Sequence, residues 1–491
     1  MTIKLKLLTK SNYLLGLQCS KLLHVKLYDK KRIPDYDESA HYRFKVGDKT
    51  EELAKTLFPG GIDIPREDFL KNLELSREFI EKRVPLFEPS FKFHQLYSRA
   101  DVLVPVNEDE WDIVEMKSAT KVKEVNLHDV SFQKYIYESC GLKIRKCFLM
   151  HINKGYIKNG EIEIDKLFTK TDITSEVDIL MENIEERIQP MLVIINNGNE
   201  PAYEIGRHCY SPYDCPMRKE CWADLPDGNI LEFYKKEKVQ AFDLGEIGLF
   251  KIPRVSNYDL EKNGGNNPFQ KQMEATNEGE GFEKRILSEF FGKIKYPICY
   301  LDIAAINPAI PRFDGMRPYQ KIPYQFSLHI QREYGGPLEH FDYLSSGNED
   351  PRIPILSMLK DNIGNTGTIL VLDKHRINSI LRDLAWNFND FSFWINQDLI
   401  PRMISLWDLL DNFHYFDIDG KLVSKIKYKI PRLSNLSHDD LNIRDSESRG
   451  YEFEEMLFGE VDQNLMNGLK EEAKGDTSSM AGVLKILKGL Y

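Results

Sequence analysis

Two neighbouring segments, Leu96-Tyr-Ser-Arg-Ala-Asp101-Val-Leu-Val-Pro105 and Trp111-Asp-Ile-Val-Glu115-Met-Lys117, decide the fold of the first half of the chain. Both are rich in β-branched and aromatic residues, and the polar stretch Glu108-Asp-Glu110 between them is typical of a turn. We therefore expect two strands joined as a hairpin. Side chains two apart on a strand project from one face. Glu115 and Lys117 thus place an acid and a base on one side of the predicted sheet.

Helices are expected on both sides of this hairpin in the sequence. The spacing of Phe44, Leu53 and Leu57 predicts a helix over residues 42–57 that ends before Pro59. Downstream, Gln133 and Tyr137 lie four apart, which puts them on one helical face. Alternating helices and strands up to residue 225 predict an α/β domain.

Hydrolysis of a phosphodiester requires carboxylates that hold a divalent metal, a nucleophilic water and positive charge nearby. Asp101 and Glu115 can supply the carboxylates, and Lys117 can orient or activate the water. Glu-x-Lys by itself is usually a solvated strand face. The ordered set of Asp101, Glu115-x-Lys117 and Gln133-x3-Tyr137 is more specific, and it resembles the RecB-like branch of the PD-(D/E)XK nucleases.

That resemblance implies roles for these residues. Asp101 and Glu115 would bind Mg²⁺ or Mn²⁺, Lys117 would be catalytic, and the helix of Gln133 and Tyr137 would contribute to the active site and its nucleic-acid contacts. The family's upstream helix often adds a histidine or glutamate ligand. Glu52 is the residue chosen here for that ligand, with Glu51 and His41 as competitors.

Four of the seven cysteines suggest a second metal centre. Cys209, Cys215 and Cys221 follow one another with five residues between each pair, and Cys19 stands far upstream. Four thiolates suit a cubane iron–sulfur cluster, and they also suit zinc. One early and three late cysteines look like the iron–sulfur nucleases of the RecB and CRISPR-adaptation families. This resemblance favours a 4Fe-4S cluster that joins the two ends of the domain, with zinc as the alternative.

The second half of the chain also resembles known domains. Residues from about 230 resemble a domain of unknown function that follows RecB-like nucleases in bacterial proteins. Within it, residues 300–315 resemble the first strands of an RNase H-like DEDD exonuclease, whose first strand carries Asp-x-Glu. Asp302 is present here, but Ala304 stands at the glutamate position and Ile377 at that of the second acid. Asp408 fits a third acid. A two-metal site that lacks ligands is expected to be inactive, and Ala304 is either natural or a deliberate change.

Composition excludes some classes of protein. The chain has 491 residues, 42% of them hydrophobic and 29% charged, which are ordinary globular values. It contains no apolar run near the roughly 20 residues of a membrane span, and its start lacks the features of a secretory signal, so a cytoplasmic location is expected. The net charge of -11 argues against a polycation that coats nucleic acid.

Together these observations predict an α/β protein with three parts. Residues 1–225 would form a PD-(D/E)XK restriction-endonuclease-like domain, 226–292 a helical connector and 293–491 a degenerate RNase H-like domain. The expected function is metal-dependent hydrolysis of DNA, single-stranded or with free ends. A nucleic-acid-binding or assembly protein that keeps the nuclease fold as a scaffold is the alternative, and a regulatory protein with a zinc site is a third interpretation.

Overall fold

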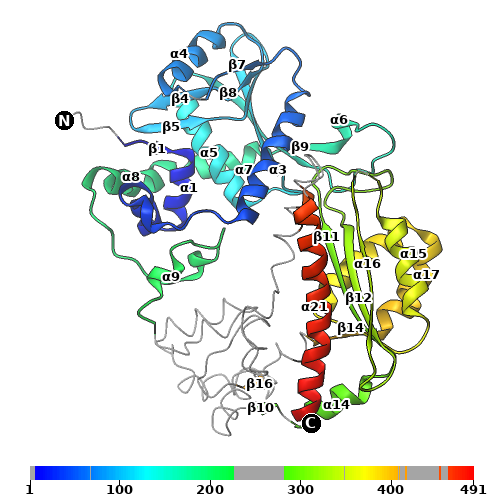
Figure 1. Ribbon diagram of the computed structural model, residues 1–491. Coiled ribbons are helices and arrows are strands. Elements are labelled where there is room, and N and C mark those ends of the chain that lie inside the picture. The colour runs from blue at the N-terminus through cyan, green and yellow to red at the C-terminus, as the bar shows by residue number, and fades with distance from the viewer. Residues whose placement is uncertain are drawn as a thin grey trace. The chain divides into compact units, whose positions relative to one another are not determined.

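The protein has an α/β fold, seen here in a computed structural model (Figure 1). The structure describes residues 6–225 except 67, residues 284–406 except 348, residues 463–490, and short pieces at 281–282, 409, 415–416, 450 and 453–454. The chain divides into two compact units. The first contains Met1–Asp224 and Ala309–Pro318, and the second contains Leu225–Pro308 and Tyr319–Tyr491. Most of the predicted connector, and Asp408, lie outside the described residues.

A six-stranded mixed sheet forms the framework of the first unit. Its order is β2-β3-β6-β7-β8-β9, in which β6 and β7 pair antiparallel and β7 and β8 pair parallel. The predicted hairpin is therefore confirmed, with Val102 opposite Val114. The strands of this sheet are β2 (Ile62–Asp63), β3 (Leu86–Phe87), β6 (Val102–Pro105), β7 (Glu110–Lys117), β8 (Lys143–Ile152) and β9 (Phe168–Asp172).

The upstream strand of the hairpin is broken, contrary to the expectation of one continuous strand over residues 96–105. Leu96–Arg99 forms β5, which pairs with β4 (Ser90–Phe93) and β1 (Leu8–Thr9) in a separate three-stranded sheet. The chain changes sheet at Ala100 and Asp101. Residues 88 and 89, between β3 and β4, lie at the corresponding change of sheet on the paired chain.

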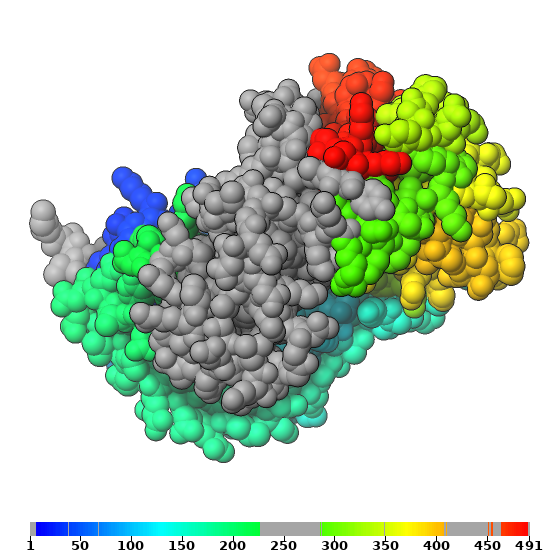
Figure 2. Space-filling view, turned by 90° about the horizontal axis from the view of Figure 1, so that it is seen from below, coloured from blue at the N-terminus to red at the C-terminus, as the bar shows by residue number. Residues whose placement is uncertain are grey.

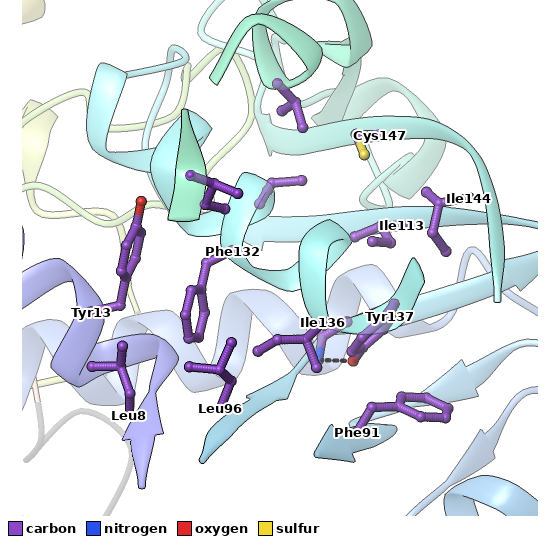
Figure 3. Packing of buried hydrophobic residues seen from close by; sticks show 14 of the residues in the cluster. Leu8, Tyr13, Phe91, Leu96, Ile113, Phe132, Ile136, Tyr137, Ile144 and Cys147 are labelled. Carbon is purple, nitrogen blue, oxygen red and sulfur yellow. Dashed lines mark hydrogen bonds between the residues drawn. The ribbon is translucent and has the colours of Figure 1, made fainter. Parts of the chain in front are cut away.

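Helix α5 (Glu124–Ser139) is the central helix of this unit, and most of its residues are buried. Tyr13 of α1 stacks on Phe132 of α5 with ring centroids 4.5 Å apart, and Phe91 packs edge-on against Tyr137 (Figure 3). The other helices of the unit are α1 (Lys10–Gln18), α2 (Ser20–Tyr28), α3 (Glu38–Lys55), α4 (Phe69–Ile80), α6 (Ile164–Leu167), α7 (Thr174–Met181), α8 (Ile184–Asn197) and α9 (Arg218–Cys221).

The predicted helix over residues 42–57 corresponds to α3, but its predicted apolar face is wrong. Phe44 is 50% exposed, whereas Thr50 and Ala54 are buried. The inward face of α3 is therefore turned relative to the expected one. This rotation matters for the acidic residues in the same helix, Glu51 and Glu52.

The second unit contains a five-stranded sheet of order β13-β12-β11-β14-β15, in which β11 is central. β12 is antiparallel to β11 and β13, and β14 runs parallel to β11 and β15. The strands are β11 (Ile298–Ile306), β12 (Ile322–Gln331), β13 (Leu338–Leu344), β14 (Thr368–Val371) and β15 (Met403–Ser405).

Helices cover this sheet on both faces, so alternate residues of β11 pack into different hydrophobic cores. Leu301 and Ile303 pack with helices α15, α16 and α17, whereas Ile298 and Tyr300 pack with α14 and α21. α14 and the C-terminal α21 pack in one apolar cluster, and Figure 2 shows the green and red surfaces of this unit. The helices are α14 (Lys284–Lys293), α15 (Arg352–Ile363), α16 (Lys374–Asn387), α17 (Asn389–Trp394) and α21 (Gln463–Leu490).

None of the helices in the described ranges is both long and apolar enough to cross a membrane.

Candidate metal centre

Glu115 lies at the centre of the candidate site, on the buried strand β7. Its Oε1 accepts hydrogen bonds from the ammonium groups of Lys117 and Lys10, the latter at 2.9 Å. Its Oε2 accepts one from Gln133 Nε2 at 2.7 Å. The side chain is fully buried, and these three donors fix the plane of its carboxylate. The structure therefore brings together Glu115, Lys117 and Gln133, as the sequence predicts.

Asp129 is the second acid of this network. It lies one helical turn before Gln133 on α5 and accepts a hydrogen bond from Gln133 Nε2 at 3.0 Å. Both lysines also reach it, Lys117 at 3.3 Å and Lys10 at 3.4 Å. The sequence interpretation missed Asp129, although its four-residue spacing from Gln133 on the same helical face was a readable signal.

Asp101 lies where the chain passes from β5 to β6, close enough to Glu115 for their charges to interact. Its Oδ2 accepts a hydrogen bond from the backbone amide of Met116 at 2.6 Å. The neighbouring amide of Ala100 donates to the hydroxyl of Tyr137 at 2.8 Å, and that hydroxyl donates to the carbonyl of Pro89 at 2.7 Å.

The structure therefore corrects the role expected of Tyr137. Its ring is fully buried, and its hydroxyl is engaged with two backbone groups. Tyr137 holds the chain next to Asp101 and does not present a polar group to a bound molecule.

A group of three carboxylates adjoins Asp101. Oxygen atoms of Glu51, Glu88 and Asp101 all lie within 4.8 Å of one another. Glu51 comes from α3, and Glu88 follows β3. The expected ligand Glu52 is exposed and is not in this group. Of the candidates on α3, Glu51 is thus the one whose carboxylate lies close to that of Asp101.

Glu88 has an unusual backbone. Its φ is 59°, in the left-handed region that non-glycine residues seldom adopt and that costs about 1–3 kcal/mol. The surrounding structure holds it there: its amide donates to the carbonyl of Asp101 at 3.1 Å, and its carbonyl accepts from Asn72 at 3.3 Å. The side chains of Arg66 and Arg99 pair with its carboxylate. No pattern in the sequence points to Glu88.

Negative charge is crowded at this centre. Burial, together with the charge of Glu115, raises the pKa of Asp101 to about 7. Burial also raises the pKa of Glu88 to about 7, with Glu51 adding to the rise and the arginines opposing it. Glu115 shows the opposite shift: burial acts to raise its pKa, but Lys10 and Lys117 hold that pKa below its ordinary range. Hard oxygen ligands beside an excess of negative charge suit Mg²⁺ or Mn²⁺.

The four cysteines Cys19, Cys209, Cys215 and Cys221 meet in a second place in the first unit. They belong to one cluster that also contains Leu22, Val25 and Met217. Burial raises the pKa of the Cys215 thiol to about 11, and the charges of the other three cysteines contribute to this shift. Soft thiolate donors fit an iron–sulfur cluster or zinc.

Hydrogen bonds join the two chain segments that supply these cysteines. Gln18, next to Cys19, donates to the carbonyl of His208 at 2.9 Å and to that of Tyr213 at 2.7 Å. Lys21 pairs with Glu220 at 3.1 Å. The other three cysteines lie elsewhere, Cys147 and Cys299 buried in the cores and Cys140 half-buried.

In the second unit, Asp302 lies on the central strand β11 and is paired with an arginine. Nη2 of Arg376, in the first turn of α16, bonds the carboxylate, and Nη1 donates to the carbonyl of Ile303 at 2.8 Å. Ala304 and Ile377 are buried. The guanidinium of Arg376 thus lies beside Asp302, and positions 304 and 377 supply no carboxylate.

Comparison with known proteins characterises only part of the chain. Residues 299–421 match a family described as a domain of unknown function (DUF2779). This match covers the central sheet of the second unit and does not include the carboxylate or cysteine residues of the first. No curated protein matches the chain.

Proposed function

We propose that the first unit is a metal-dependent nuclease that hydrolyses phosphodiester bonds of DNA. The observation that carries the proposal is the convergence of Asp101, Glu115 and Lys117 with Gln133 in one buried charged network. Asp101 and the pair Glu115 and Lys117 lie at the ends of two strands, and Gln133 lies on a helix. Each is the residue type that the resemblance to RecB-like nucleases requires at its position. Burial of so many charges is costly for stability alone, which favours a functional reason for the arrangement.

Asp101, Glu115 and Glu51 are the proposed metal ligands, with Glu88 beside them. A bound Mg²⁺ or Mn²⁺ would activate water and polarise the phosphate oxygen. Lys117 remains an ammonium, because Glu115 and Asp129 raise its pKa against the effect of burial. We assign it to hold the attacking water and to place positive charge near the phosphate. Gln133 keeps Glu115 in orientation.

We propose further that Cys19, Cys209, Cys215 and Cys221 bind a 4Fe-4S cluster. Their convergence from both ends of the first unit supports a soft-metal centre, and the resemblance to iron–sulfur nucleases favours iron over zinc. Absorbance near 400 nm in the purified protein, a region expected for thiolate-ligated iron clusters, separates the two.

The second unit is proposed to bind the DNA strand without cutting it. The pairing of Arg376 with Asp302 supports the lack of cutting, because a guanidinium next to this acid opposes the binding of two cations there. Ala304 removes a further ligand.

Cleavage of end-labelled single- and double-stranded DNA by anaerobically purified protein with Mn²⁺ tests the nuclease proposal. Lys117→Ala should lower the rate by about 10²–10⁴-fold, the range of a lost acid–base or orienting group. Lys71→Ala serves as the matched control, since Lys71 is an exposed lysine on α4. Equal rates for the Lys117 variant and the parent would refute the site. Binding of DNA by a parent protein that never cleaves it would favour a binding protein that keeps the nuclease fold as a scaffold.

A further inference from the structure

Lys10 is a second lysine beside the buried acids Glu115 and Asp129, and no sequence motif predicts its position there. Its Nζ lies 2.9 Å from Glu115 Oε1 and 3.4 Å from Asp129 Oδ1. Lys10 is also the first residue of α1. Positive charge is unfavourable at the N-terminus of a helix, where the dipole is itself positive. The position of Lys10 is therefore explained by the two acids it reaches and not by the stability of its own helix.

Lys10 restricts which oxygen of Glu115 remains available. A carboxylate oxygen has two acceptor positions. Oε1 receives both ammonium groups, from Lys10 and Lys117, whereas Oε2 receives only Gln133. The remaining acceptor capacity of Glu115 is thus on Oε2. Without Lys10, Oε1 would regain a free position and the carboxylate would lose one of its three fixed contacts.

The other end of α1 is held by residues 208–221, which carry Cys209, Cys215 and Cys221 and are called the cysteine loop here. Cys19 caps the helix, its amide bonding the carbonyl of Leu15 at 2.8 Å, and the preceding Gln18 donates to the carbonyls of His208 and Tyr213. Between the two ends, Tyr13 stacks on Phe132 of α5, the helix that carries Asp129. A nine-residue helix, about 13 Å long at 1.5 Å per residue, therefore connects the two centres.

We propose that Lys10 is a positioning residue for Glu115, and that α1 couples the acid site to the cysteine loop through it. This inference rests on the proposed nuclease function of the same site. The loop fixes the C-terminal end of α1 through Gln18. The helix, packed on α5, then fixes where Lys10 meets Glu115.

The first test uses the full chain and varies the Mn²⁺ concentration in the DNA cleavage assay. Lys10→Ala should lower the maximal rate about 10- to 100-fold, as loss of an outer partner of a metal ligand does. The Mn²⁺ concentration for half-maximal rate should not rise, because the Lys10 ammonium, which competes with Mn²⁺ for Glu115, has been removed. Lys10→Arg should recover part of the rate, and Lys71→Ala should match the parent. General misfolding would instead lower the maximal rate and raise the Mn²⁺ concentration for half-maximal rate. Melting curves of each variant check for misfolding.

A double-mutant cycle tests the coupling. Gln18→Met keeps the side-chain volume but cannot donate to the cysteine loop, and it should lower the maximal rate in the same way as Lys10→Ala. Combining the two changes should lower the rate little further, because both act on the same contact. Purely multiplicative effects would show that the loop and Lys10 act independently, which would overturn the coupling.

The outcomes separate this inference from the function on which it depends. An active parent with an equally active Lys10→Ala variant overturns the role of Lys10 and leaves the nuclease proposal standing. A parent that neither cleaves DNA nor binds Mn²⁺, measured by electron paramagnetic resonance of the free ion, overturns both.

Discussion

Glu51 and Glu52 are neighbours in sequence with opposite environments. Glu51 joins Asp101 and Glu88 in the carboxylate group, whereas Glu52 is exposed. Successive helical residues differ by about 100° in direction, so only one of the two can face the site. The choice between them depends on how α3 is turned against the sheet.

We predict that Glu51→Gln lowers both Mn²⁺ affinity and the cleavage rate, each by about 10-fold or more, because a ligand carboxylate is lost. Glu52→Gln removes the same charge from the same helix and should leave both unchanged. Isothermal titration with Mn²⁺ and the cleavage assay measure the difference. Equal effects of the two substitutions would mean that the orientation of α3 is not what selects the ligand.

Sequence reasoning succeeded where the spacing of a single element decides the geometry. Glu115 and Lys117 share a strand face because side chains alternate, and Gln133 follows from a helical repeat. It failed where the position depends on tertiary packing. Phe44 gave the wrong face of α3, and Lys10 and Glu88 reach the site only because α1 and the change of sheet bring them there. Local periodicity contains no information about these contacts.

At the scale of elements, α21 packs along the second sheet through buried polar contacts as well as apolar ones. His329 of β12 has its Nδ1 2.8 Å from the hydroxyl of Thr477 on α21, and its ring lies 4.4 Å from that of His340 on β13. Burial, with smaller effects of His340 and Lys474, lowers the pKa of His329 from its ordinary 6.5 to about 4. The folded protein therefore keeps this imidazole neutral.

The stability of the second unit should consequently depend on pH. An unfolded chain binds a proton at His329 below pH 6.5, whereas the folded chain does so only near pH 4, so stability falls as the pH drops from 6.5 to about 4. Calorimetric melting of the full chain across this range measures the effect. His329→Gln should flatten the dependence, and substitution of the exposed His375 by Gln should not. An unchanged pH profile in the His329 variant would contradict the assignment.

At the scale of the whole chain, the four clustered cysteines come from the early and late parts of the first unit's main segment, Met1–Asp224. Cys19 and the three late cysteines enclose most of that unit's sequence. A cross-link that closes so long a loop restricts the unfolded chain strongly, by several kcal/mol in the simple entropic estimate. Metal binding at these thiols should therefore be coupled to the folding of the unit.

Cys215→Ser should lower metal content and the melting temperature together, because one ligand of the proposed centre is lost. Cys140→Ser is the matched control, since Cys140 is half-buried and lies outside the cluster. Elemental analysis for iron and zinc, run beside thermal melting, measures both effects. Full metal occupancy in the Cys215 variant would remove that residue from the ligand set.

The arginine beside Asp302 bears on what a second acid on β11 would do. Residues 302 and 304 are two apart on β11, so a glutamate placed at 304 would project on the same side as Asp302. Arg376 bonds both Asp302 and the backbone of Ile303, and it would remain there to neutralise such a pair. Ala304→Glu alone would therefore add another ion pair before it added a metal site. A cation site at this point of the sheet would require Arg376 to change as well.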